Sequence, residues 1–77
     1  MSIEDRVRRI LSAVLESDYP PGTPVTREAE PKWDSLKHVE VIFAVEDEFG
    51  IQLDEDRMAR IQSLDDIVKA VEAGDAP

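Results

Sequence analysis

The sequence contains no cysteine, which excludes disulfide bonds, zinc–thiolate sites and a cysteine nucleophile. It also lacks any apolar run approaching the roughly 18 residues of a membrane-spanning helix. No long apolar stretch follows the N-terminal charges, so we expect no signal peptide and a cytoplasmic protein. The 77 residues are expected to form a single domain, with little room for a deep catalytic cleft.

Basic residues are scarce, with 9 Lys and Arg against 18 Asp and Glu, for a net charge of −9. Nucleic acid is therefore not expected as a partner, because binding it requires basic side chains that neutralise phosphates. The excess is uneven: residues 1–29 carry 5 acidic and 4 basic groups (net −1), and residues 30–77 carry 13 and 5 (net −8). This distribution favours partners with basic surfaces, and the alternative is an ordinary solvated acidic surface.

The first segment predicts an amphipathic helix that starts after Ser2 as its N-cap and ends near Ser17 or Asp18. The helix cannot continue through Pro20 and the proline that follows it. Its apolar stripe comprises Ile3, Val7, Ile10, Leu11, Val14 and Leu15.

Residues 18–33 contain four prolines and no strand-like alternation, so they are expected to form one long loop. The expected anchors of this loop on the helices are Tyr19, Val25 and Trp33. Trp33 is interpreted as a hydrophobic lid over one end of the bundle.

The second helix is predicted over about residues 35–49. Asp34 or Ser35 is its expected N-cap, and Gly50 is well suited to end it in the left-handed conformation.

A short third helix is predicted at about 55–61, capped by Asp54, and a fourth at about 64–73, capped by Ser63. Residues 74–77 are expected to fray. The predicted fold is therefore all-α: a small four-helix bundle with three longer helices, one short helix and a long first loop.

The tripeptide Asp34-Ser35-Leu36 lies where the long loop meets the second helix. A phosphate on Ser35 would be stabilised there by free backbone N–H groups and by the helix dipole. Asp34 offers a carboxylate for a metal ion when an enzyme delivers the phosphate, and Leu36 is expected to point into the core. The alternative is that the serine serves only as a helix cap.

The run from Trp33 to Ile42 and the following run from Ala44 to Ile51 resemble the core of acyl carrier proteins. The family pattern is Asp-Ser-Leu followed by an acidic and apolar helix that ends in Glu-Glu-Phe. The resemblance continues through Asp54-Glu55 and Ile61 into Ser63-Leu64-Asp65-Asp66-Ile67, and so covers nearly the whole chain.

The resemblance implies a carrier and not an enzyme. A phosphopantetheinyl transferase would attach 4′-phosphopantetheine from coenzyme A to Ser35, with Asp34 and Leu36 flanking the attachment site. Acyl groups would then be carried as thioesters to partner enzymes of fatty-acid, polyketide or related specialised biosynthesis.

Some positions depart from the family pattern. Lys37 stands where fatty-acid carriers commonly have an acid, Leu53-Asp54 replaces a frequent Ile-Pro, and Pro-Lys-Trp at residues 31–33 replaces a Gly-rich or aliphatic approach. The Gly-Gly that precedes the serine of peptidyl carriers is absent, which favours an acyl cargo. A peptidyl or aminoacyl carrier and an unmodified acidic interaction module remain as alternatives.

One arc of the second helix is predicted to dock the transferase and the acyl-loading and acyl-processing enzymes, through basic patches on those partners. At about 100° per residue the apolar residues Leu36, Val39, Ile42, Val45 and Phe49 lie largely outside this arc. The alternative is that its members are ordinary solvated positions. The arc comprises Lys37, Glu40, Ala44, Asp47 and Glu48, with Phe43 at its edge.

His38 is the only histidine and follows Ser35 by about one helical turn, so a Ser–His nucleophilic pair is conceivable. No third group is evident to orient the histidine, and we instead expect a partly exposed side chain. We therefore predict no catalytic residue and no metal site, and we expect a monomer.

Overall fold

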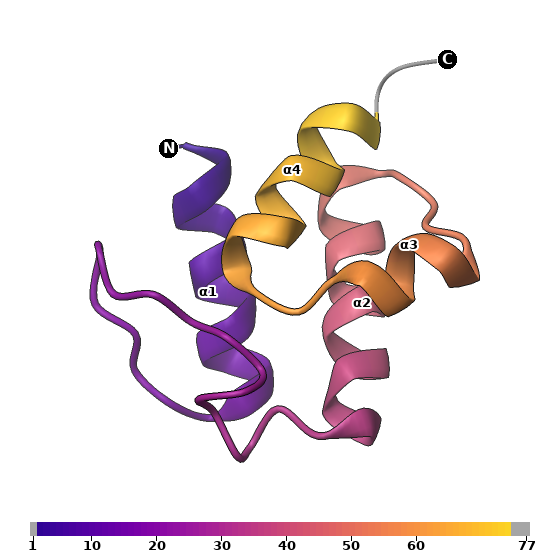
Figure 1. Cartoon of the computed structure of the whole chain (residues 1–77). Coiled ribbons are helices and arrows are strands. Elements are labelled where there is room, and N and C mark those ends of the chain that lie inside the picture. Colours follow the sequence, from indigo (N-terminus) through magenta and orange to yellow (C-terminus); the bar gives the residue numbers. More distant parts are fainter. Residues whose placement is uncertain (1, 75–77) are drawn as a thin grey trace.

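The computed structural model describes residues 2–74, which form four α-helices around one hydrophobic core (Figure 1). This agrees with the predicted all-α bundle of three longer helices and one short helix. The predicted frayed tail falls mostly on residues 75–77, which lie outside the described residues, and Gly74 belongs to the last helix. The helices are α1 (Ile3–Leu15), α2 (Ser35–Phe49), α3 (Glu55–Arg60) and α4 (Leu64–Gly74).

Side chains cap the start of every helix where the sequence predicted a cap. In each case a hydroxyl or carboxyl oxygen accepts a hydrogen bond from an amide three residues later, which would otherwise lack a partner at the helix start. The four caps are Ser2 to Asp5 N at 3.1 Å, Asp34 to Lys37 N at 2.9 Å, Asp54 to Arg57 N at 2.8 Å, and Ser63 to Asp66 N at 3.1 Å.

The helix ends follow the prediction less closely. Helix α1 stops at Leu15, before the predicted Ser17, because Glu16 takes a left-handed conformation with φ of 53°. Its N–H group then bonds to the Ser12 carbonyl and closes the helix. Helix α2 ends as predicted at Gly50, which has φ of 64° and donates its N–H to the Glu46 carbonyl.

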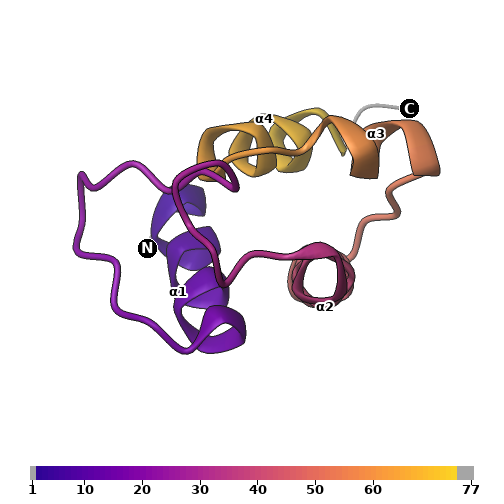
Figure 2. The same cartoon turned by 60° about the horizontal axis from the view of Figure 1, so that its bottom comes forward.

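Helix α1 packs against both α2 and α4, as the two views of the fold show (Figures 1 and 2). The three longer helices supply most of the core, whereas α3 has no buried residue and lies at the edge of the bundle. Burial of each large aliphatic side chain contributes about 1.5–3 kcal/mol, so α3 must be held mainly by other interactions. The helical core side chains are Val7, Leu11 and Leu15 from α1, Val41, Ile42 and Val45 from α2, and Leu64, Ile67 and Val71 from α4.

The loop between α1 and α2 is fastened by the anchors that the sequence predicted. Val25 and Trp33 are buried in the core, and Tyr19 is half-buried against it. The Val25 carbonyl also accepts a hydrogen bond from Leu64 N at 2.9 Å. Arg27 N donates to the Gln62 carbonyl, also at 2.9 Å, so backbone bonds join the loop to the connection between α3 and α4.

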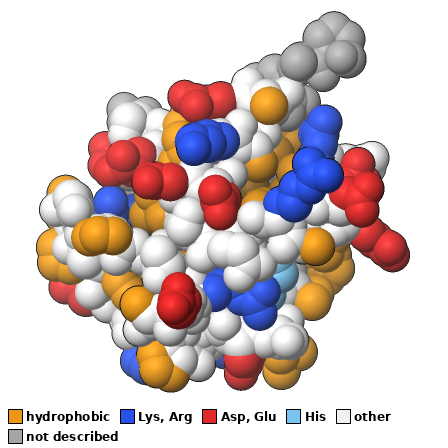
Figure 3. All heavy atoms as spheres, viewed as in Figure 1, with side chains coloured by type: hydrophobic (Ala, Val, Ile, Leu, Met, Phe, Trp, Pro, Cys, Tyr) orange, Lys and Arg blue, Asp and Glu red, His pale blue; other side chains and the backbone are white. Residues whose placement is uncertain are grey.

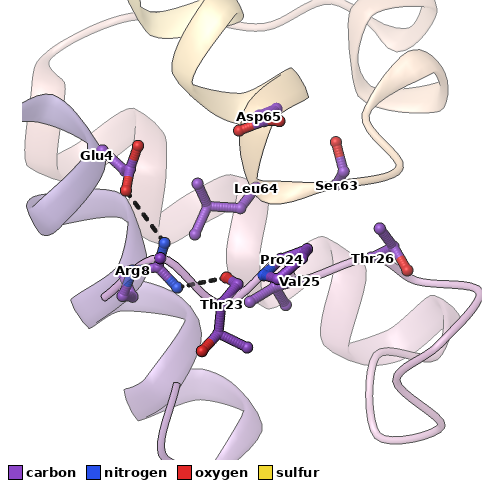
Figure 4. A pocket seen from close by; sticks show the side chains of 10 residues that line it. Glu4, Arg8, Thr23, Pro24, Val25, Thr26, Ser63, Leu64 and Asp65 are labelled. Atoms are coloured by element: carbon purple, nitrogen blue, oxygen red, sulfur yellow. Dashed lines mark hydrogen bonds and ion pairs between the residues drawn. The ribbon is translucent and has the colours of Figure 1, made fainter. Parts of the chain in front are cut away.

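Arg8 is buried in α1, a position that the sequence analysis did not identify. Its guanidinium donates to the Thr23 carbonyl at 2.7 Å and to the Glu4 carboxylate at 3.1 Å (Figure 4). These bonds satisfy much of the desolvated charge and hold the tip of the first loop against α1. Arg8 lines a hollow of about 220 Å³ whose other side is formed by the start of α4 at Leu64.

Within residues 2–74, none of the helices combines the length and the apolar character needed to cross a membrane.

Candidate functional site

The start of α2 is fixed by Asp34, whose backbone is extended with φ of −87° and ψ of −174°. Its carboxylate accepts from Lys37 N, and its carbonyl accepts from His38 N at 2.8 Å. Ser35 follows as the first residue of α2 and is exposed. The serine hydroxyl is therefore accessible to solvent at the positive end of a helix whose first turn is held in place.

Leu36 does not point into the core, so that prediction is wrong: its side chain is 72% exposed. The core face of α2 at this end is occupied by His38, which shares that face with Val41, Ile42 and Val45. Leu36 precedes His38 by two residues, or about 200° around the helix, and therefore points away from the bundle.

Three large apolar side chains of α2 face solvent together. Leu36, Val39 and Phe43 are exposed by 72%, 38% and 63%. Their spacing of three and four residues places them on one side of the helix, which we call the apolar strip. An exposed apolar surface rimmed by charges is typical of a protein interaction site. The sequence analysis assigned only Phe43 to the surface.

The charged residues of the predicted docking arc differ in how far they are neutralised. Lys37 and Glu40 form an ion pair at 3.5 Å, one turn apart on α2. Glu48 is exposed and pairs with Arg6 of α1 at 2.9 Å. Ala44 is half-buried between these charged positions, and Asp47 is exposed with no ion pair among the described residues.

Charges of both signs also mix elsewhere on the surface. On the face shown in Figure 3, acidic and basic side chains are interspersed, and apolar side chains reach the surface between them. The acidic excess of residues 30–77 therefore does not form one continuous acidic patch on this face.

His38 is buried, with 8% exposure, and the expectation of a partly exposed histidine is wrong. Its Nδ1 accepts a hydrogen bond from the indole Nε1–H of Trp33 at 3.0 Å. Its Nε2 lies 2.8 Å from the backbone carbonyl oxygen of Met58. Because Nδ1 accepts, the proton of a neutral ring resides on Nε2, which donates to Met58. We call these three groups the Trp33–His38–Met58 network.

This network joins three segments of the protein beside Ser35. Trp33 ends the first loop and is 2% exposed, His38 lies in the first turn of α2, and Met58 belongs to α3. Both ring nitrogens of His38 are engaged away from Ser35, so the histidine cannot act as a base for the serine hydroxyl. A buried indole N–H needs an acceptor, and this requirement was the signal in the sequence that could have linked Trp33 to His38.

Comparison with known proteins gives a consistent family assignment, although no protein-family model matches the chain. The chain is 33% identical over 79 residues to acyl carrier protein 3 of Ralstonia nicotianae, covering 94% of this chain and 84% of that protein. It is also 33% identical over 70 residues to the acyl carrier proteins of Rickettsia massiliae and Rickettsia prowazekii, covering 90% of this chain and 81% of each relative. The chain therefore belongs to the acyl carrier protein family, whose members are carriers and not enzymes.

Proposed function

We propose that Ser35 is the attachment point of a 4′-phosphopantetheine arm and that the protein carries acyl groups on it to enzymes of fatty-acid, polyketide or related specialised biosynthesis. The observation that supports this most directly is the placement of Ser35. It is an exposed hydroxyl at the first residue of α2, directly after the Asp34 cap, in a member of a family of carriers.

The residues around Ser35 fit a phosphodiester. A phosphate there adds negative charge at the positive end of a 15-residue helix, where the dipole stabilises it. Asp34 uses Oδ1 to cap Lys37 N, which leaves Oδ2 for a metal ion that a transferase brings with coenzyme A. Exposure of Leu36 keeps the neighbouring surface open, so that the hydroxyl can be reached by a transferase.

Loading exchanges one phosphorus–oxygen bond for another and transfers one proton. The Ser35 oxygen bonds to the phosphorus that carries pantetheine, the pyrophosphate P–O bond of coenzyme A breaks, and adenosine bisphosphate leaves while the hydroxyl proton passes to the transferase. When bound, the arm supplies a terminal thiol that holds acyl groups as thioesters. The chain has no cysteine, so that thiol would have no competitor in the protein.

Partner enzymes are proposed to dock on α2 next to Ser35. The predicted arc of Lys37, Glu40, Ala44, Asp47 and Glu48, with Phe43 at its edge, is extended here by the exposed side chains of Leu36 and Val39. The apolar strip supplies area that a partner can bury, and the acids beside it favour a basic rim on that partner. Because Arg6 and Lys37 partly offset Glu48 and Glu40, Asp47 is the acid most available to such a rim.

Intact-mass spectrometry tests the attachment directly. Incubation with coenzyme A, magnesium and a broad-specificity phosphopantetheinyl transferase should add one arm per protein molecule, located on Ser35. Ser35→Ala should add none, and the control Ser2→Ala, at the cap of α1, should load like the wild type. An arm on another serine, or no arm with several transferases, would contradict the proposal.

A further inference from the structure

We propose that the Trp33–His38–Met58 network closes the bundle beside Ser35 to short alkyl chains, and that short or polar acyl groups on this carrier therefore stay outside the helices. The inference rests on the proposed function, since it concerns the cargo attached through Ser35.

Side chains fill the space beside the attachment point. An apolar cargo on Ser35 could gain by entering the bundle where the first turn of α2 faces α3. That position is where His38 meets the Met58 carbonyl. Trp33 fills the core next to it with only 2% of its side chain exposed. Because protein interiors are close-packed, an alkyl chain could enter only by displacing these side chains.

Displacement of these side chains would also break their hydrogen bonds. The indole N–H of Trp33 and both ring nitrogens of His38 are satisfied only through the network. An alkyl chain has no donor or acceptor to replace these bonds. The free-energy cost of leaving two buried hydrogen-bonding groups unpaired equals the gain from burying roughly three to seven methylenes. A short acyl chain cannot supply that many, and a polar acyl group loses further through its own desolvation.

An alternative position for the acyl group exists outside the bundle. The apolar strip of Leu36, Val39 and Phe43 starts at the residue after Ser35 and faces solvent. A short acyl group lying along this strip reduces its own exposure without opening the core. It also stays accessible to an enzyme that docks on α2.

Trp33 offers a direct readout, because it is the only tryptophan and gives a single indole N–H signal in nuclear magnetic resonance. The protein would be loaded by a transferase with pantetheine arms from coenzyme A, butyryl-coenzyme A and hexanoyl-coenzyme A. We expect the indole N–H shift and its protection from exchange to be the same in all three forms. Hydroxylamine should also cleave the butyryl and hexanoyl thioesters at the same rate, because neither is sheltered.

A matched variant tests the cause. Trp33→Leu removes the indole and its hydrogen bond while keeping an apolar side chain, so hexanoyl cleavage should become slower than butyryl cleavage in this variant only. The control Tyr19→Phe alters another loop anchor and should behave as the wild type. If Trp33→Leu does not fold, the comparison of the butyryl and hexanoyl forms of the wild type still tests whether the bundle is closed.

Two outcomes separate this inference from the proposed function. A progressive shift of the indole signal with acyl length, or slower cleavage of hexanoyl than butyryl in the wild type, would overturn the closed-bundle inference while the arm is present by mass. Failure to load any arm would instead overturn the proposed function on which it rests.

Discussion

Replacement of His38 by leucine is expected to destabilise the protein by about 1–4 kcal/mol. Leucine is close to histidine in size, so most of the packing is retained. The substitution leaves the buried indole N–H of Trp33 without a partner, and the Met58 carbonyl keeps only the N–H of Ile61, at 3.3 Å. An orphaned buried donor costs about 1–3 kcal/mol, and the loss at the half-buried Met58 carbonyl is smaller because that oxygen keeps one donor. The expected loss is a large share of the roughly 4–12 kcal/mol available to a domain of 77 residues.

A double-mutant cycle isolates the bond between the two rings. Trp33→Phe orphans Nδ1 of His38 and also removes packing volume, so it should destabilise by about 1–4 kcal/mol. The double variant removes both members of the Trp33–His38 bond, and neither is then left as an unpaired buried group. Its loss should be smaller than the sum of the single losses, by about 0.5–3 kcal/mol.

Urea unfolding followed by circular dichroism measures all members of the cycle, since none of the substitutions removes the helical signal. His38→Leu should also lower the melting temperature by about 4 °C or more. Val39→Ala, on the exposed apolar strip, is the control and should change stability by less than about 0.5 kcal/mol. Additive losses in the cycle, or a His38→Leu loss as small as that of the control, would refute the reasoning.

Burial, and then the hydrogen bond with Glu30, raise the pKa of Tyr19 from 10.0 to about 12. The stability that Tyr19 contributes should be fully present below pH 10.0 and lost as pH rises toward 12. This would be contradicted if the tyrosinate absorbance of the folded protein titrated near 10.0. The same bond lowers the pKa of Glu30. Glu30 therefore contributes stability above its ordinary pKa, and this contribution is lost as pH falls through the lowered value. Tyr19→Phe should raise the pKa of Glu30 in a carboxyl titration followed by nuclear magnetic resonance. Residues 30–77 carry a net charge of −8, and added cations should screen the repulsion among them. The melting temperature should therefore rise with NaCl and rise further with millimolar calcium or magnesium. A melting temperature that responds to neither would show that the acids are too dispersed to matter. Glu40→Lys and Asp47→Lys should slow transferase loading through the association rate and change stability by only about 0–1 kcal/mol, while Lys37→Glu should leave loading unchanged or faster. Loading rates that ignore all three substitutions would remove α2 as the docking surface.

Local chemistry explains why the helix starts were predictable. Each cap is an interaction between residues three positions apart, and Gly50 ends α2 through its own backbone conformation. The placement of Ser35 follows from the same short-range pattern, because Asp34 fixes where α2 begins.

The errors come from interactions that join distant parts of the chain. His38 was expected to be partly exposed and Arg8 was not singled out, because a periodic pattern records polarity and not partners. Each is buried because a backbone carbonyl 15 or 20 residues further along the chain accepts its hydrogen bond. The ion pair of Glu48 with Arg6 spans 42 residues, so the periodic pattern of a single helix could not predict it either.

Leu36 was misplaced for a different reason. In a helical projection it lies about 20° from Phe43, so the sequence contained the signal for exposure. Its apolar character outweighed that angle in the prediction. In the structure His38 occupies the core-facing position instead, and Leu36 joins the apolar strip.

The acceptor that Met58 provides is a backbone carbonyl, and this affects how the protein can diverge. Any residue that keeps α3 helical at position 58 can present the same oxygen, so this hydrogen bond does not restrict the side chain there, which is limited only by its half-buried packing against the core. Trp33 and His38 contribute side-chain atoms to their bond, and a change in one leaves the other buried without a partner. Over evolutionary time, tryptophan at 33 and histidine at 38 are therefore expected to be kept together or replaced together.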